Sequence, residues 1–117
     1  MNVSDIENIV LDVSELKQEA ILSNSRKQEL VKARQLIMYF AVLYFKKSMT
    51  LYRIGSKVNR DHATVLHSVK VIELLEFQKF EPYLSWKKEI EKRIIRINWQ
   101  VLNFKVCKYS QVFSINK

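Results

Sequence analysis

One stretch of this sequence groups side chains whose chemistry suits contact with nucleic acid. Long cations can bind phosphates, a hydroxyl and an imidazole can hydrogen-bond to base edges, a carboxylate can accept from a cytosine amine, and a methyl group can pack against thymine. These groups belong to Arg60, Asp61, His62, Ala63, Thr64, His67 and Lys70. We therefore expect this stretch to bind double-stranded DNA.

The same residues do not suit catalysis or metal binding. Asp61 and His62 are not accompanied by a recognisable nucleophile, oxyanion donors or a phosphate-binding loop. His62 and His67 are five residues apart and do not share a helix face, and the single cysteine, Cys107, is distant in the sequence. We therefore expect no enzymatic activity, no cofactor and no metal site.

A helix over residues 61–77 would divide these side chains between two faces. At 100° per residue, Val65, Val69 and Ile72 fall within about 60° of one another and form a core face. The other face carries Arg60, Ala63, Thr64, His67 and Lys70. The pattern predicts a helix with one side in the core and the other free to meet DNA.

A shorter helix is expected directly before this one. Thr50 can cap a helix that ends near Gly55, and Val58 and Asn59 then provide a tight turn. A short helix, a tight turn and a second helix form the helix-turn-helix motif, which presents its second helix to the major groove. Helical domains of other functions share this spacing, so the outward side chains carry the prediction of DNA binding.

The remainder of the chain is expected to be helical as well. Only one glycine and one proline occur in 117 residues, and 48% of the residues are hydrophobic, enough for one core. Capping patterns at Ser4 and Ser14 predict two short helices, the first over residues 5–12, and Ser25 with Gln28 precedes a long helix over 26–45. The fold class is therefore all-α.

The region after Pro82 is expected to form an amphipathic helix and a short tail. Trp86, Ile90 and Ile94 make one apolar stripe, whereas Ile95 lies on roughly the opposite side. Either the first stripe packs on the domain as a closing helix, or the helix contacts a second copy or a protein partner, mostly through the second stripe. The partner residues considered are Trp86, Ile90, Ile95, Trp99 and Leu102. Residues 104–113 are a short strand or an irregular tail.

The charge distribution favours a polyanionic partner. The net charge is +8, but residues 1–22 carry one basic and five acidic residues, whereas residues 23–80 carry eleven basic and four acidic ones. Clustered cations bind nucleic acid by displacing counterions, although a basic helix such as the one after Pro82 also suits an anionic membrane surface. No run of about 20 uncharged apolar residues is present and the start carries acidic residues, so we expect no membrane insertion and a cytoplasmic, nucleoid-associated location.

Two separated motifs resemble a known family. Residues 25–35 read SRKQELVKARQ, and residues 60–70 read RDHATVLHSVK after Ile54 and Gly55. In this order they are similar to the C-terminal DNA-binding domain of the bacterial replication initiator DnaA. The resemblance covers about residues 3–77 and implies a Trp-repressor-like helix-turn-helix bundle that binds DnaA-box-type sites. We expect a stand-alone protein with a DNA-binding domain over 1–80 and a basic, aromatic extension over 81–117.

The resemblance also implies a role for individual residues. Arg26 corresponds to the family's basic residue in the minor groove, and Arg34 and Gln35 correspond to residues that hold phosphates. Asp61 and His62 correspond to base-reading residues, whereas Arg60, Thr64, His67 and Lys70 contact the backbone or support the reading helix. The complete expected DNA-binding set is Arg26, Lys27, Arg34, Gln35, Arg60, Asp61, His62, Ala63, Thr64, His67 and Lys70.

Several positions depart from the family pattern. Ala63 stands where threonine is common, so a methyl contact is kept and a hydroxyl is lost. Val58 and Asn59 replace two glycines in a turn one residue shorter, Tyr52 stands where proline is usual, and the loop before Thr50 is about two residues longer. The chain also lacks the glycine-rich, lysine-containing loop of an ATPase.

The sequence thus predicts specific DNA binding in replication initiation or its regulation. Two alternatives share the same fold. The first is a protein-interaction module that acts through the C-terminal helix, and the second is a transcriptional regulator that uses the same helix-turn-helix.

Overall fold

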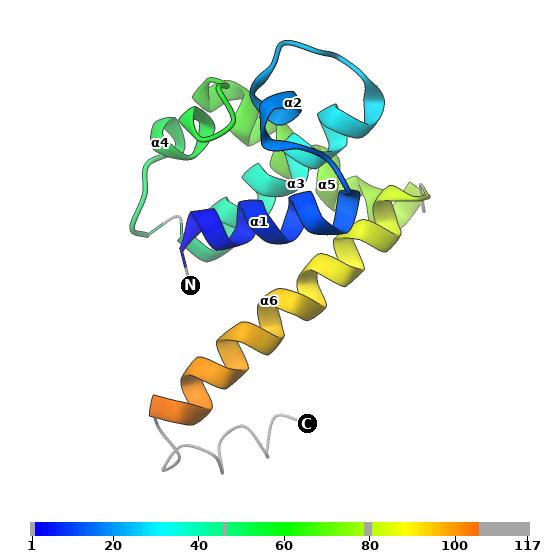
Figure 1. The fold of residues 1–117 in the computed structure, drawn as a ribbon. Helices are drawn as coiled ribbons and strands as arrows, with labels where there is room; N and C mark the ends of the chain where they lie inside the picture. The colour runs from blue at the N-terminus through cyan, green and yellow to red at the C-terminus, as the bar shows by residue number, and fades with distance from the viewer. Residues whose placement is uncertain (1, 46, 79–80, 106–117) are drawn as a thin grey trace.

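The computed structural model describes residues 2–45, 47–78 and 81–105. Helices account for all of the regular secondary structure in these ranges, which confirms the all-α fold class. The order along the chain is α1 (Val3–Ser14), α2 (Gln18–Leu22), α3 (Gln28–Phe45), α4 (Leu51–Ser56), α5 (His62–Gln78) and α6 (Tyr83–Lys105) (Figure 1). Residues 104 and 105 belong to α6, and the rest of the expected strand or tail lies outside the described residues.

Of the predicted helix caps, the one at Thr50 is present, whereas those at Ser4 and Ser14 are not. Thr50 caps α4, since its Oγ1 accepts a hydrogen bond from the Arg53 N–H at 3.2 Å. By contrast, α1 is capped by Asn2 and Asp5, whose side chains each accept from the other's backbone N–H at 3.0 and 2.8 Å. The expected cap at Ser4 is therefore wrong, because the reciprocal pair forms two residues earlier.

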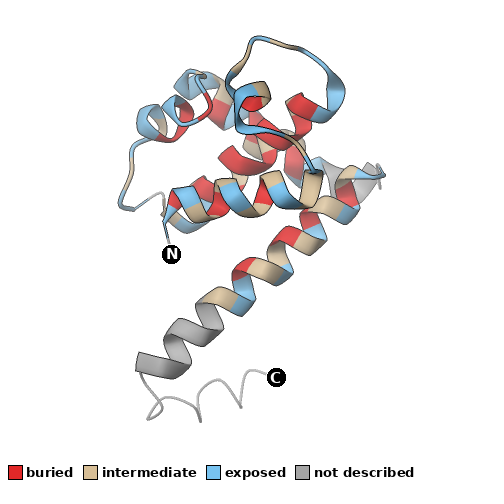
Figure 2. Ribbon diagram, in the orientation of Figure 1, coloured by how far each residue is buried: buried red, intermediate tan, exposed pale blue. Residues whose placement is uncertain are grey.

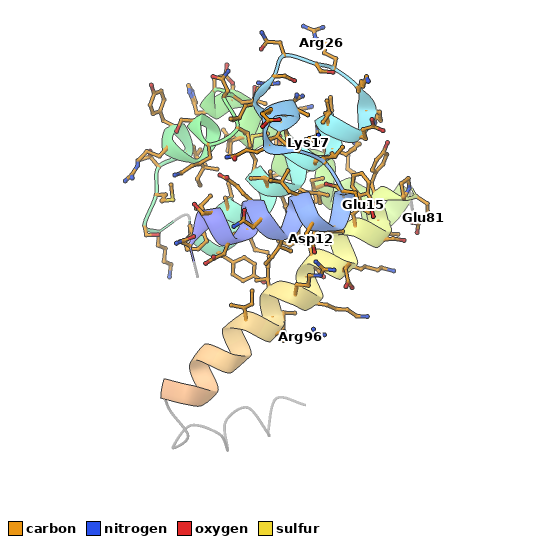
Figure 3. The ribbon with its side chains drawn as sticks, viewed as in Figure 1. Asp12, Glu15, Lys17, Arg26, Glu81 and Arg96 are labelled. Carbon is orange, nitrogen blue, oxygen red and sulfur yellow. The ribbon has the colours of Figure 1, made fainter. Side chains whose placement is uncertain are left out.

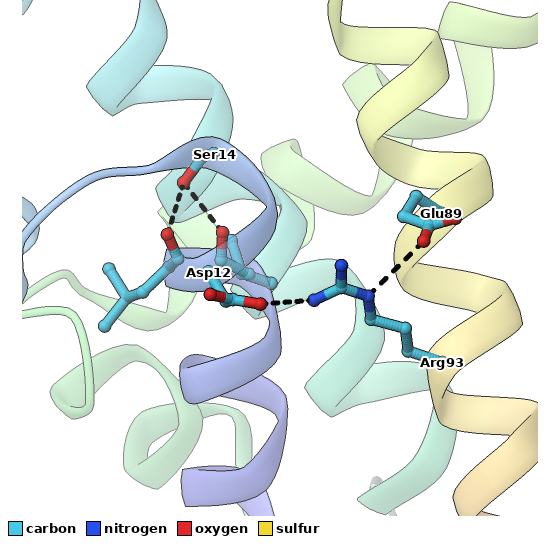
Figure 4. Close-up of polar contacts among 6 residues, drawn as sticks. Asp12, Ser14, Glu89 and Arg93 are labelled. Atoms are coloured by element: carbon cyan, nitrogen blue, oxygen red, sulfur yellow. Dashed lines mark hydrogen bonds and ion pairs between the residues drawn. The ribbon is translucent and has the colours of Figure 1, made fainter.

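Ser14 ends α1 and does not begin α2. Its hydroxyl donates back to the carbonyl of Val10 at 2.7 Å, with a longer contact of 3.5 Å to Leu11 (Figure 4). The chain then turns at Glu15, which has a φ of 59°, and α2 starts after Lys17. The expected cap at Ser14 is thus wrong, because the hydroxyl is already used within the preceding helix.

The core surrounds α3, which contacts α1, α2, α4 and α5. Figure 2 shows buried residues on the inward sides of these helices and on one side of α6. Fully buried apolar side chains come from five helices and from the turn after α4: Ile6, Val10, Leu36, Ile37, Met38, Phe40, Ile54, Val58, Ile72, Ile90 and Ile94. The long helix predicted before residue 45 therefore crosses the centre of the domain.

The helix α6 closes the core from one side and then extends away from it (Figure 1). It packs against α1 and α5, and Ile90 and Ile94 are both fully buried in the common core. Trp86 is partly buried against the same core and lies edge-on to Tyr83, with ring centroids 5.2 Å apart. The stripe therefore serves the closing helix, as one of the two alternatives expected.

The other alternative, partner docking, is wrong for Ile90, which is fully buried in the chain's own core. Trp86 is partly buried against the same core, whereas Ile95 is 59% exposed. The side chains of Trp99 and Leu102 lie outside the described part of the chain. A division between residues 1–80 and 81–117 stays a prediction. In the structure, α6 shares its core with the helices before it.

Within the residues that the structure describes, no helix combines the length and the apolar character needed to cross a membrane.

Candidate nucleic-acid interface

The turn between α4 and α5 is tight although it contains no glycine of its own. Asn59 adopts a φ of 59°, the left-handed region that asparagine tolerates better than most residues. Val58 is fully buried and anchors the turn, and the Arg60 N–H donates to the Gly55 carbonyl at 2.8 Å. The sequence Val58–Asn59 therefore makes the turn that two glycines make in the family pattern.

Gly55 is required by the close approach of α4 to the beginning of α5. A Cβ atom at this position would lie 2.4 Å from the Arg60 carbonyl oxygen and 3.1 Å from that of Asp61. Both neighbours are backbone atoms, which cannot rotate away as a flexible side chain can. The absence of a side chain at Gly55 thus sets the distance between the two helices of the motif.

Asp61 caps the reading helix. Its Oδ1 accepts hydrogen bonds from the Thr64 backbone N–H at 2.8 Å and from the Thr64 hydroxyl at 2.7 Å. The hydrogen bond from the Thr64 hydroxyl is the main cause that lowers the pKa of the Asp61 carboxyl below its ordinary value. The hydrogen bond from the Thr64 backbone N–H lowers it further. Asp61 thus stabilises the start of α5, and a contact to a base stays a prediction.

The two faces predicted for α5 are present in the structure. Val65 and Ile72 are fully buried and Val69 is half-buried, together with a buried Ser68 that was not expected there. Thr64 is half-buried, so it lies at the edge between the two faces. The exposed residues of the predicted set on this helix are His62, Ala63, His67 and Lys70.

A hollow of about 600 Å³ opens beside the start of α5. We call it the arginine hollow, and it is lined by Asn24, Arg26, Val31, Arg34, Gln35, Met38, Asn59, Arg60, Asp61, Thr64 and Ser68. These residues come from the loop of residues 23–27 that joins α2 to α3, from α3 itself, and from the turn and first part of α5. Two motifs that are far apart in the sequence therefore form one concave surface.

The arginine hollow brings together six members of the predicted set. They are Arg26, Arg34, Gln35, Arg60, Asp61 and Thr64. Exposed Lys27, His62, Ala63, His67 and Lys70 do not line it. Asn24 and Asn59 also line the hollow and were not predicted, although both stand in polar loops next to predicted site residues. Met38 and Ser68 were not predicted either, and both are buried side chains on helices.

Arg34 occupies a position different from the one expected. The residue is only 3% exposed, and its guanidinium donates to the carbonyls of Ile21 at 2.6 Å, Ser25 at 2.7 Å, and both Ala20 and Ser23 at 3.0 Å. Burial, and then the positive charge of Arg60, lower the pKa of Arg34. The phosphate contact expected for Arg34 is therefore corrected to an internal contact, because chain carbonyls occupy its donors.

Arg26 points outward from the interface (Figure 3), whereas Gln35 is partly buried. Arg26 is exposed on the loop of residues 23–27 and projects from its outer edge, away from the helices (Figure 3). Because α3 begins at Gln28, Arg26 lies before the helix and not in its first turn as expected. The Oε1 of Gln35 is buried and has no hydrogen-bond partner among the described residues, although the residue lines the hollow.

These features define a helix-turn-helix DNA-binding domain. A short helix and a tight turn present α5 with a polar, exposed face, and the adjoining hollow contains three arginines and one carboxylate. The chain matches the family described as "Bacterial dnaA protein helix-turn-helix" over residues 3–72, and it belongs to that family. The resemblance found in the two sequence motifs is thus confirmed.

Similar proteins carry the name chromosomal replication initiator protein DnaA. The chain is 41% identical to the one from Flavobacterium psychrophilum over 86 residues, which cover 68% of the chain and 18% of that protein. It is 40% identical to that of Bacteroides fragilis over 74 residues, covering 62% and 15%, and 33% identical to that of Agrobacterium fabrum over 99 residues, covering 84% and 20%. The chain spans about a fifth or less of these relatives, so the family shows a DNA-binding domain and not the activity of the whole initiator.

Proposed function

We propose that this chain binds double-stranded DNA at DnaA-box-like sites and acts in replication initiation or its regulation. The observation that carries the proposal is the arginine hollow, where residues from the 25–35 motif and the 60–70 motif meet beside the exposed face of α5. A second support is the family, whose printed description is a helix-turn-helix of the bacterial dnaA protein. A location on the nucleoid, in the cytoplasm, follows from the same proposal.

The proposed complex places α5 in the major groove and the loop of residues 23–27 over the neighbouring minor groove. At the start of α5, four residues would read base edges, with Ala63 packing on a thymine methyl group. These are Asp61, His62, Ala63 and Thr64. Arg26 would enter the minor groove, where a narrow A/T-rich groove concentrates negative potential. Lys27, Gln35, His67 and Lys70 would contact the phosphate backbone or support the reading helix.

A direct test compares two duplexes of equal length and composition. Fluorescence anisotropy measures the dissociation constant for a DnaA-box duplex and for a scrambled one over a range of salt concentrations. We expect a clear preference for the box that persists at physiological salt, because base contacts do not depend on counterion release. Equal and salt-erased affinity for both duplexes would contradict specific recognition.

Two variants separate base reading from backbone contact. His62→Ala is expected to remove about 1 to 3 kcal/mol of discrimination between the two duplexes. Lys70→Ala is expected to weaken binding to both duplexes alike, since a phosphate contact carries no sequence information. The same anisotropy titrations measure both effects, and the reverse pattern would refute the assignment of these two residues.

A further inference from the structure

One backbone carbonyl in the loop of residues 23–27 accepts hydrogen bonds from two arginines. The Ser23 carbonyl receives Nη2 of Arg34 at 3.0 Å and Nη2 of Arg60 at 3.1 Å. Arg34 comes from the middle of α3, and Arg60 comes from the turn before α5, 37 residues after Ser23. A single peptide group therefore links the loop, the central helix and the start of the reading helix.

Other donors of both guanidiniums also go to backbone carbonyls. Arg60 donates through Nη1 to Asn59 at 2.8 Å and to Val58 at 3.3 Å. Arg34 holds a second carbonyl in the same loop, that of Ser25, at 2.7 Å. Since buried carbonyls without partners are costly, the two side chains together fix the path of the loop.

The loop held in this way carries Arg26. The bound carbonyls of Ser23 and Ser25 lie three residues and one residue before it, and Arg60 immediately precedes Asp61 and the reading helix. The contacts of Arg34 and Arg60 therefore determine where the loop lies relative to the start of α5. If the loop were free, it would lose conformational entropy when it became ordered on DNA, and this loss would weaken binding.

We propose that Arg34 and Arg60 are positioning residues for DNA recognition, forming a clamp on the Ser23 carbonyl that sets the spacing between the two groove-binding elements. The clamp replaces the phosphate contacts expected for these two arginines. The inference rests on the proposed function, because the spacing matters only if Arg26 and α5 bind one duplex.

The clamp predicts a different binding defect from a phosphate contact. Loss of a phosphate contact weakens every duplex and reduces the slope of log affinity against log salt by about 0.9. Loss of a positioning contact weakens the specific duplex and leaves the salt slope unchanged, because the number of bound phosphates is the same. The two roles of Arg60 are therefore distinguishable in one set of titrations.

The first experiment measures Arg60→Gln on the DnaA-box and scrambled duplexes over a range of salt. We expect the ratio of the two affinities to fall about threefold to tenfold, the cost of ordering a long side chain and its loop on binding, with the salt slope of wild type. Arg96→Gln, the same charge change on an exposed face of α6, is the matched control and should keep the wild-type ratio. A uniform loss with a smaller slope would overturn the clamp.

A double-mutant cycle tests whether Arg60 acts through the loop. If it positions Arg26, the effect of Arg60→Gln on the affinity ratio should largely disappear in an Arg26→Ala background. Additive losses from the two substitutions would mean that Arg60 acts on DNA independently, which contradicts the proposal.

A readout without DNA keeps the clamp testable by itself. Trypsin cleaves after Arg26 and Lys27, both exposed in the loop. Arg60→Gln should accelerate this cleavage in the free protein, and so should Arg34→Lys, since an ammonium cannot hold several carbonyls as a guanidinium fork does. Far-ultraviolet circular dichroism checks that both variants are folded, and unchanged cleavage in a folded variant would overturn the clamp. Failure of the wild-type protein to distinguish the duplexes would refute the proposed function and leave this measurement intact.

Discussion

The arginine hollow and α6 are both rich in cations, but they satisfy those cations in opposite ways. In the hollow, Arg34 and Arg60 donate to backbone carbonyls, which carry no formal charge. On α6, Lys87 pairs with Glu91 at 2.9 Å, and Arg93 pairs with Asp12 on α1 at 2.6 Å and with Glu89 (Figure 4). The hollow therefore keeps a positive charge that suits a polyanion, whereas the charges of Lys87 and Arg93 on α6 are neutralised by carboxylates of the same chain.

The two regions also differ in what their burial serves. On α6, Ile90 and Ile94 fill the core, and the paired cations border that contact. Around the hollow, the close contacts of Gly55 and Asp61 with their neighbours fix backbone positions at the start of α5. We therefore expect substitutions on the inner face of α6 to change stability, and substitutions around the hollow to change recognition.

The largest effect is expected from Ile90→Ala. The substitution removes a fully buried side chain and leaves a cavity between α6 and the core, which should cost about 2 to 5 kcal/mol of unfolding free energy. Ile95→Ala, on the exposed side of the same helix, should change it by no more than about 0.5 kcal/mol. Urea unfolding followed by circular dichroism measures both, and equal losses would mean that α6 is not part of the core.

Gly55→Ala should have the next largest effect, and it should act on recognition as well as stability. The new methyl group would collide with the Arg60 carbonyl and move the start of α5, at a cost of about 1 to 3 kcal/mol. Ser56→Ala, on the exposed neighbouring position, is the control. Urea unfolding and the box-to-scrambled affinity ratio should both fall for the glycine variant alone, and an unchanged ratio would show that the turn does not set the reading geometry.

The salt dependence of binding tests which cations meet DNA. Lys70→Gln should lower the slope of log affinity against log salt by about 0.9, the loss of one phosphate contact. Lys92→Gln should leave the slope unchanged, since Lys92 is exposed on α6, away from the proposed interface. In Figure 3, Arg96 on the same helix lies far from Arg26. Anisotropy titrations at several salt concentrations measure the slopes, and a decrease for Lys92→Gln would extend the DNA surface onto α6.

The smallest effect concerns the pH dependence of the Asp61 cap. The folded-state pKa of Asp61 lies below the ordinary value of 3.8, so its contribution to stability is complete above that value and is lost as the pH falls through the folded pKa. Asp61→Ala should lower the thermal midpoint at pH 7, and the difference from wild type should shrink below about pH 4. Asp61→Asn, which can cap without titrating, is the control. A deficit in Asp61→Ala that persists unchanged at acid pH would mean that the carboxylate does not stabilise the helix start.

The local features of the reading motif could be predicted from the sequence. Thr50 caps α4 as the spacing indicated, and Val65 and Ile72 point into the core. Each of these features depends on residues within one or two helical turns, where backbone geometry relates sequence spacing directly to position. The paired caps at Asn2 and Asp5 show the limit, because two equivalent capping patterns overlapped and only one could form.

The hydrogen-bond partners of the arginines could not be predicted in this way. Arg34 was expected to hold a phosphate, but it is bound to carbonyls of residues 9 to 14 positions earlier, and Arg60 reaches a carbonyl 37 positions away. Periodicity places a guanidinium on a face of a helix, but it does not say which distant backbone groups face it. Likewise, the stripe of Trp86 and Ile90 fitted both a closing helix and a docking surface until its contact with α1 was known.

By itself, the sequence determined an all-α helix-turn-helix protein, the family to which it belongs, and the residues of α5 that face away from the core. The tertiary structure decided which arginines are held by carbonyls of the chain itself. The physical reason is that an arginine bonds to whatever acceptors surround it, and for Arg34 and Arg60 those acceptors meet only when α2, α3 and the turn before α5 have packed.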